Sequence, residues 1–189
     1  MSILKVNTIQ KKDGTQFPLI GQVVQGTDQT ATTISASGGT FYSAGASASI
    51  TPTSTSSKIL VTVSLSAVQN TNGNSIVKLV RTAPSSVDLL SNTGGSNING
   101  TFGGVFFSDT NYIHCLNFSY LDSPATTSLC TYTAKVGCSG AITFYVNRSV
   151  NATVNGAYER GVSYVYIEEL NGNDVNENEI QSGITEYTF

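Results

Sequence analysis

The stretch KILVTVSLSAV, residues Lys58–Val68, decides the fold. Its alternate residues are apolar, and most of the residues between them are polar. A period of two matches a β-strand and cannot lie on one face of a helix. One face of this strand is therefore predicted to be core and the other mostly exposed. The residues of the predicted core face are Ile59, Val61, Val63, Leu65 and Ala67.

Other stretches continue this pattern. Ser75–Thr82 follows an amide-rich turn at Asn70–Asn74 and is predicted to pair with Lys58–Val68 as a hairpin. Gly161–Leu170 is apolar on both faces, which indicates a central strand or a subunit interface. Three further strands are each expected to turn one apolar row toward the core. The first row is Leu116, Phe118 and Tyr120. The second is Cys130, Tyr132, Ala134 and Val136, and the third is Ile142, Phe144 and Val146.

The whole pattern gives about eight strands separated by turns, which is typical of an all-β antiparallel sandwich or jelly roll. Residues 92–104 are expected to form a long loop before a short strand at Val105–Ser108. No stretch has a convincing helical period. Three parts are predicted: an N-terminal attachment and trimerisation arm at 1–24, a jelly-roll-like body at 25–170 and an acidic C-terminal tail at 171–189.

Charge is scarce and unevenly placed. Only 11 % of residues are charged and the net charge is −3, which argues against binding to nucleic acid. The first twelve residues carry Lys5, Lys11 and Lys12 without an acid, and no Lys or Arg follows Arg160. The two ends are either simply solvated or pair with a neighbouring subunit or partner. The acids of the C-terminal end are Glu168, Glu169, Asp174, Glu177, Glu179 and Glu186.

Processing signals are weak. The first ten residues are too short and polar for a secretory signal, and no apolar run is long enough to enter a membrane, so synthesis in a cytosol is expected. Three cysteines cannot form a complete disulfide framework, and buried free thiols are expected. Four glycosylation sequons carry little weight without a secretion route, and they begin at Asn99, Asn117, Asn147 and Asn151.

The His, Cys and acidic side chains that could perform catalysis form no recognisable catalytic motif in the sequence. His114 and Cys115 are neighbours and should lie on opposite faces of a strand. A dyad of His114 with Cys130 or Cys138 is a weaker alternative, and these cysteines lack the close spacing of a zinc knuckle. Neither a metal nor another cofactor is predicted, and the protein is not expected to be an enzyme. The acids at strand ends, Asp109 and Asp122, are expected to form turns.

Aromatic residues near loops are the better functional candidates. Tyr112 and Tyr158 lie beside polar turns, and Tyr145 faces away from the apolar row of its strand. An exposed tyrosine can stack on a sugar or anchor a protein interface. These three residues are therefore predicted to bind a receptor glycan, with packing against a neighbouring subunit as the alternative.

Several segments resemble, in order, the tail-fibre proteins of tailed phages, particularly marine and cyanobacterial ones. The resemblance covers most of residues 1–170, and the segments together are fairly specific. They are LKVNTIQ at Leu4–Gln10, ASITPTSTSSKILV at Ala48–Val61, VKLVR at Val77–Arg81, LDSPATTS at Leu121–Ser128 and FYVNRS at Phe144–Ser149. Residues after Asn171 extend beyond the usual end of such chains.

The resemblance implies a homotrimeric virion protein that is made in the host cytoplasm, attaches to the particle at one end and turns its β body outward. We expect a receptor-binding protein that contacts host surface glycan. The alternatives are a capsid decoration, cement or head-fibre protein and, less well supported, a polysaccharide-active enzyme. The expected subunit interface contains Val162, Tyr164 and Tyr166, and the expected attachment arm contains Leu4, Val6, Ile9, Lys11 and Lys12.

Overall fold

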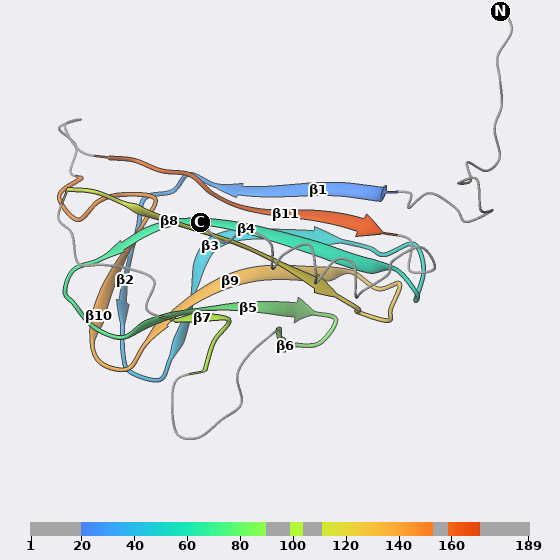
Figure 1. Cartoon of the computed structure of the whole chain (residues 1–189), viewed down its shortest axis with the longest axis horizontal. Helices are drawn as coiled ribbons and strands as arrows, with labels where there is room; N and C mark the ends of the chain where they lie inside the picture. Colours follow the sequence, from blue (N-terminus) through green and yellow to red (C-terminus); the bar gives the residue numbers. More distant parts are fainter. Residues whose placement is uncertain (1–19, 90–98, 104–110, 153–158, 171–189) are drawn as a thin grey trace, which may run out of the picture.

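The computed structural model describes residues 20–89, 99–103, 111–152 and 159–170. These residues contain eleven strands and no helix, and the strands pair antiparallel in two sheets that pack as a β-sandwich (Figure 1). The predicted all-β sandwich is therefore confirmed, and its jelly-roll subtype stays a prediction. Within the described residues no helix is long and apolar enough to cross a membrane.

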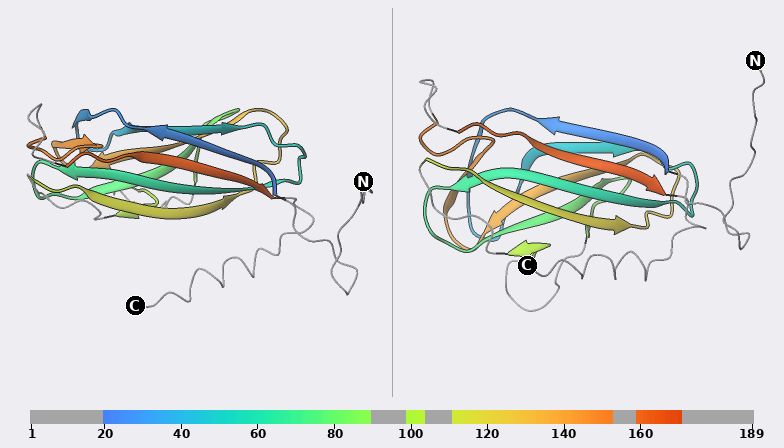
Figure 2. Two further views of the ribbon diagram at one scale, coloured as in Figure 1. Left: turned by 90° about the horizontal axis from the view of Figure 1, so that it is seen from above. Right: turned by 45° about the horizontal axis from the view of Figure 1, so that its top comes forward.

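The larger sheet contains six strands: β1 (Ile20–Asp28), β2 (Thr32–Ala36), β4 (Lys58–Gln69), β8 (His114–Asp122), β10 (Ile142–Val146) and β11 (Ser163–Leu170). Their order is β1-β11-β4-β10-β2, and β8 pairs with the other edge of β4. The right-hand view of Figure 2 shows β1, β11, β4 and β8 side by side. The longest strand, β4, is therefore the centre of this sheet.

The smaller sheet contains five strands: β3 (Phe41–Ile50), β5 (Ser75–Ala83), β6 (Val87–Leu89), β7 (Phe102–Gly103) and β9 (Cys130–Cys138). Their order is β3-β9-β5-β6, and β7 also pairs with β5. The strands β6 and β7 were not predicted, because two or three residues are too few to show a period. β7 lies within the predicted loop 92–104, and the predicted strand at 105–108 lies outside the described residues.

The core lies between the apolar rows that the two sheets turn toward each other. The predicted core face of β4 is confirmed, because each of its five side chains is at most 1 % exposed. The predicted rows of β9 and β10 are also buried, and the β8 row is buried or half-buried at the sheet edge. The prediction that the second face of β4 is mostly exposed was wrong, because Ser64, Ser66 and Val68 are under 10 % exposed and the rest of this face is half-buried. The register with β11 places Tyr164 beside Ser64, and the low exposure of Ser64 follows from this large neighbouring side chain.

The predicted hairpin between Lys58–Val68 and Ser75–Thr82 is wrong. β5 pairs with β9 and β6 in the smaller sheet, so the connection at 70–74 crosses from one sheet to the other. Both strands have an apolar row, and the crossing lets the two rows face each other across the core. A period of two shows which face is apolar but does not show whether the strand partner is the next one in sequence.

The body begins earlier than residue 25. β1 starts at Ile20 and pairs with β11 from Ile20↔Leu170 to Asp28↔Ser163, so residues 20–24 belong to the body and not to the arm. At this edge β1 closely approaches β3. A Cβ added to Gly26 would lie 1.7 Å from the Ser47 carbonyl oxygen, so only glycine fits. The arm residues 1–19 and the tail 171–189 lie outside the described residues.

The register of β1 with β11 defines two poles of the body. The terminal pole is the end at which β1 begins and β11 ends, where Ile20 lies opposite Leu170. The far pole is the opposite end, where Asp28 lies opposite Ser163. The segments that precede and follow the body are therefore attached side by side at the terminal pole.

We expect Val63→Asp to unfold the body, because the carboxylate would be placed at a position that is 1 % exposed and lined by apolar side chains. Circular dichroism and urea unfolding of the purified protein would measure this loss. Val87→Asp is the matched control, because Val87 is 37 % exposed on β6. A Val63→Asp protein that unfolds at the wild-type urea concentration would contradict the assigned core.

Candidate functional site

The side of the larger sheet that faces away from the core is the first candidate site, and we call it the outward face. The register places Tyr166 between Gln25 of β1 and Thr62 of β4, so these side chains share this face. Val23 is 52 % exposed there. Most side chains of the outward face are aromatic, aliphatic or hydroxyl-bearing. Its members on β1, β11, β4 and β8 are Val23, Gln25, Thr27, Tyr164, Tyr166, Glu168, Lys58, Leu60, Thr62, Ser64, Ser66, Cys115, Asn117, Ser119 and Leu121.

Two of the three predicted interface residues lie on this face. Tyr164 and Tyr166 are half-buried and point outward, whereas Val165 and Ile167 of the same strand are fully buried in the core. Val162, just before β11, is 43 % exposed. The strand β11 lies between β1 and β4, so the central-strand alternative for Gly161–Leu170 is confirmed, and its role as a subunit interface remains a prediction.

Hydrogen bonds join polar side chains on the outward face, both between neighbouring strands and within β11. The hydroxyls of Thr62 and Ser119 lie 2.8 Å apart, and the hydroxyl of Tyr166 donates to Glu168 at 2.9 Å. The hydrogen bond to Glu168 raises the pKa of Tyr166. Several polar groups of the outward face are therefore satisfied within the face itself.

The predicted glycan-binding tyrosines do not form one described cluster. Tyr112 is 59 % exposed, and Tyr145 is half-buried with the Arg148 guanidinium 5.1 Å from its ring centre. Register places Tyr145 beside Val68 on one side of β4, whereas β8, which follows Tyr112, lies along the other side. Tyr158 lies outside the described residues, as do the arm residues Leu4, Val6, Ile9, Lys11 and Lys12.

Asp122 does not have the predicted turn-forming role. It is 5 % exposed, forms an ion pair with Arg81 and accepts a hydrogen bond from the Tyr132 hydroxyl at 2.8 Å. Burial, followed by the nearby Asp122 charge, raises the pKa of Tyr132. The three residues come from β8, β5 and β9, so this buried cluster joins the two sheets near the terminal pole. Asp109 lies outside the described residues.

Glu169 is a second buried carboxylate, and its burial is not evident from its place among the acids of the C-terminal end. It is 1 % exposed and accepts hydrogen bonds from the Gln22 amide at 2.8 Å and from the Thr53 backbone N–H and hydroxyl at 2.6 and 2.8 Å. Burial by itself raises the pKa of Glu169, but the hydrogen bonds donated to it outweigh burial, so its pKa is lowered. The carboxylate therefore fastens the Thr51–Ser57 loop to β1 and β11.

Asn147 joins three segments at the far pole. Its side chain is fully buried, and its backbone has a φ of 58°, in the left-handed region. Its amide nitrogen donates to the backbone oxygens of Asp28 and Thr30 at 2.9 and 3.2 Å, and its amide oxygen accepts from Ser163 at 2.6 Å. The sequon at Asn147 is therefore a structural position, whereas Asn117 is exposed on the outward face.

The cysteines and the histidine form no described reactive site. Register pairs Cys115 with Ser66 and His114 with Ala67, so the prediction of opposite faces is confirmed. Cys130 and Cys138 are buried free thiols as expected, and burial raises the pKa of both. Cys115 is exposed, which corrects the expectation for that residue. Among the described residues no group of three or more His, Cys, Asp or Glu side chains could hold a metal ion.

No protein-family model matches the chain, and no curated protein matches it.

Glu169→Gln should lower the free energy of unfolding at neutral pH by about 2 kcal/mol, because a buried donor loses its acceptor. Since the folded pKa of Glu169 is lowered, its contribution is present above the unfolded pKa of about 4.3 and is lost as pH falls through the folded pKa. The variant should therefore lose part of the acid sensitivity of the wild type.

Urea unfolding at pH values from about 7 down to about 3 covers this range. Glu168→Gln is the control, because Glu168 is the adjacent residue of β11 and points to the outward face. Equal stability of Glu169→Gln and wild type at neutral pH would contradict the anchoring role.

Proposed function

We propose that this protein is a trimeric receptor-binding subunit of a phage tail fibre that contacts glycan on the host surface. The observation that carries the proposal is the difference between the two sides of the sandwich. The outward face of the larger sheet presents Tyr164, Tyr166 and aliphatic side chains with few charges, whereas the exposed side of the smaller sheet carries hydroxyls, Lys78, Lys135, Asp88 and one aromatic ring, Phe41.

The composition of the outward face supports self-association. The centre of a protein interface is enriched in aromatic residues and depleted of charge. On this face the charged side chains, Lys58 and Glu168, belong to the end of the sheet near the terminal pole. The number of subunits comes from the resemblance to tail-fibre proteins, which implies a trimer.

The position of the chain ends supports attachment at one pole. Ile20 and Leu170 are opposite one another in the β1–β11 pair, so the basic segment 1–19 and the acidic segment 171–189 are attached side by side. Attachment to the particle through this pole leaves the far pole and the smaller sheet turned toward the host.

Light scattering after size exclusion should give three times the chain mass of 19.9 kDa for the wild type. Tyr164→Arg should give the monomer mass with an unchanged circular dichroism spectrum, because three guanidinium groups would be buried at the interface without partners. Ser49→Arg, on the exposed side of the smaller sheet, should remain trimeric. A wild-type protein that is monomeric at micromolar concentration would overturn the assembly.

Receptor binding is tested by competition. An excess of the purified protein should reduce adsorption of its phage to host cells, because the free protein occupies the same glycans. A heat-unfolded sample at equal concentration is the control. Undiminished adsorption, together with no binding of the folded protein to host envelope polysaccharide, would contradict the receptor role.

A capsid decoration role is the second candidate, and the adjacent attachment of oppositely charged end segments favours it. Opposite charges at one pole suit docking into a repeated surface lattice. Immunogold labelling of virions distinguishes the two candidates, since gold on the tail supports the fibre and gold on the head supports decoration.

A further inference from the structure

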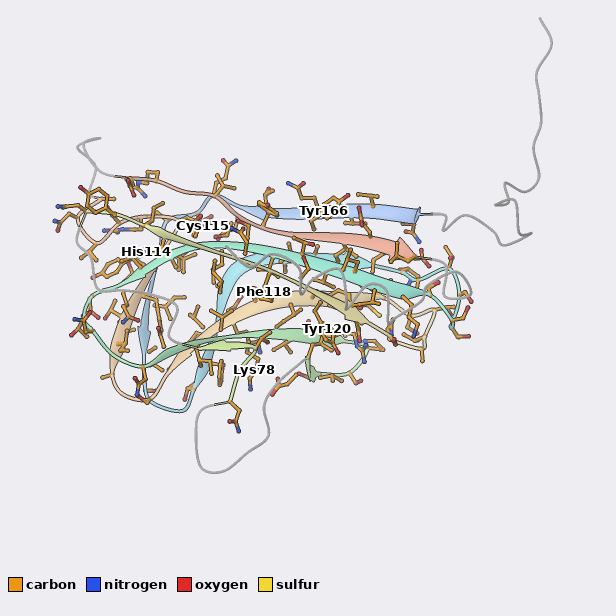
Figure 3. All side chains as sticks on the ribbon, viewed as in Figure 1. Lys78, His114, Cys115, Phe118, Tyr120 and Tyr166 are labelled. Carbon is orange, nitrogen blue, oxygen red and sulfur yellow. The ribbon has the colours of Figure 1, made fainter. Side chains whose placement is uncertain are left out.

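The exposed side of the smaller sheet carries a compact group of one aromatic and three charged side chains, which we call the lysine patch. Its members are Phe41 on β3, Lys78 on β5, Asp88 on β6 and Lys135 on β9. Lys78 and Lys135 are directly opposite one another in the β5–β9 pair. Figure 3 shows Lys78 on the opposite side of the sandwich from Tyr166. The patch is therefore separate from the outward face.

Charge within the patch is not balanced. The Lys78 ammonium lies 2.7 Å from the Asp88 carboxylate and 4.1 Å from the centre of the Phe41 ring, so Lys78 is already paired. Lys135 forms no ion pair with any residue that the structure describes. Like charges that face each other across a strand pair are destabilising. A local excess of one positive charge, in a chain of net charge −3, therefore suits an anionic ligand.

The surroundings of Lys135 provide the other elements of a sugar site. Phe41 lies across Gly137, where an added Cβ would come within 2.9 Å of two ring carbons, so glycine lets the ring lie close to the sheet. Ser43 is opposite Lys135, and Ser47 is opposite Thr133 in the next part of the same strand pair. An aromatic ring, neutral hydroxyls and one ammonium group are what a sugar with a single carboxylate requires.

We propose that the lysine patch binds an acidic saccharide, with the sugar carboxylate accepting a hydrogen bond from Lys135 and the sugar ring lying against Phe41. A neutral sugar leaves Lys135 unpaired. A nucleic acid needs a row of cations, and among the described residues this patch offers one ammonium group without an ion pair. The inference rests on one part of the proposed function, which is that the smaller sheet of the attached protein is turned toward the host.

The test uses the purified full-length protein on an array of three sets of oligosaccharides: sugars with uronic or sialic acid residues, the same sugars as carboxyl methyl esters, and neutral sugars. The acidic set should bind at least about tenfold more tightly than its esters, because esterification removes the charge-assisted hydrogen bond. The ester comparison leaves the protein unchanged, so it does not depend on how any variant folds.

Lys135→Gln should weaken binding to the acidic set by about tenfold and leave the melting temperature near that of wild type. Lys58→Gln is the matched control, because Lys58 lies on β4 in the other sheet. Equal binding of acids and esters, or full binding by Lys135→Gln, would overturn the acidic-saccharide site while the receptor function stands. Absence of binding to all three sets would overturn the site and count against the receptor function as well.

Discussion

Every strand of the larger sheet takes its register from β4, either directly or through one neighbour. β8 pairs with one edge of β4, β11 and β10 share the other, and β1 and β2 follow through β11 and β10. A shift of β4 by one residue would turn its apolar row to solvent and its serines to the core. The alternation in one strand therefore fixes which way Tyr164 and Tyr166 point, and so fixes the composition of the outward face.

Buried polar groups supplement this register at the ends of the strands. Asp122 joins the sheets, Glu169 holds the Thr51–Ser57 loop, and Asn147 joins strand ends at the far pole. Each is satisfied by specific partners, so each favours one arrangement of its loop. A chain with few charges thus places two of its carboxylates where they determine structure, and the exposed sides of the sandwich are left mainly to hydroxyls, amides and aromatic rings.

The sequence predicted the architecture well because alternation is a local signal. It identified the buried rows of β4, β9 and β10. It also identified the apolar side chains on both faces of β11, and it placed Tyr145 away from the core. It paired β5 wrongly, because an amide-rich turn is compatible with a hairpin and with a crossing between sheets. It missed the buried role of Asp122 and the patch around Lys135, because both depend on neighbours that are distant in sequence. The Lys78–Lys135 pair becomes visible only when β5 lies beside β9.

The buried position of Asn147 also limits where the protein can be manufactured. Asn147, Arg148 and Ser149 form a sequon that a eukaryotic secretory cell can modify during translocation, before the chain folds. An oligosaccharide on this amide nitrogen would displace the hydrogen bonds to Asp28 and Thr30 and would have no space in a position with no solvent exposure. The same three residues are harmless in a bacterial cytosol. The fold is thus suited to a compartment that lacks N-glycosylation, and secretion from yeast or animal cells would require a different residue at Ser149.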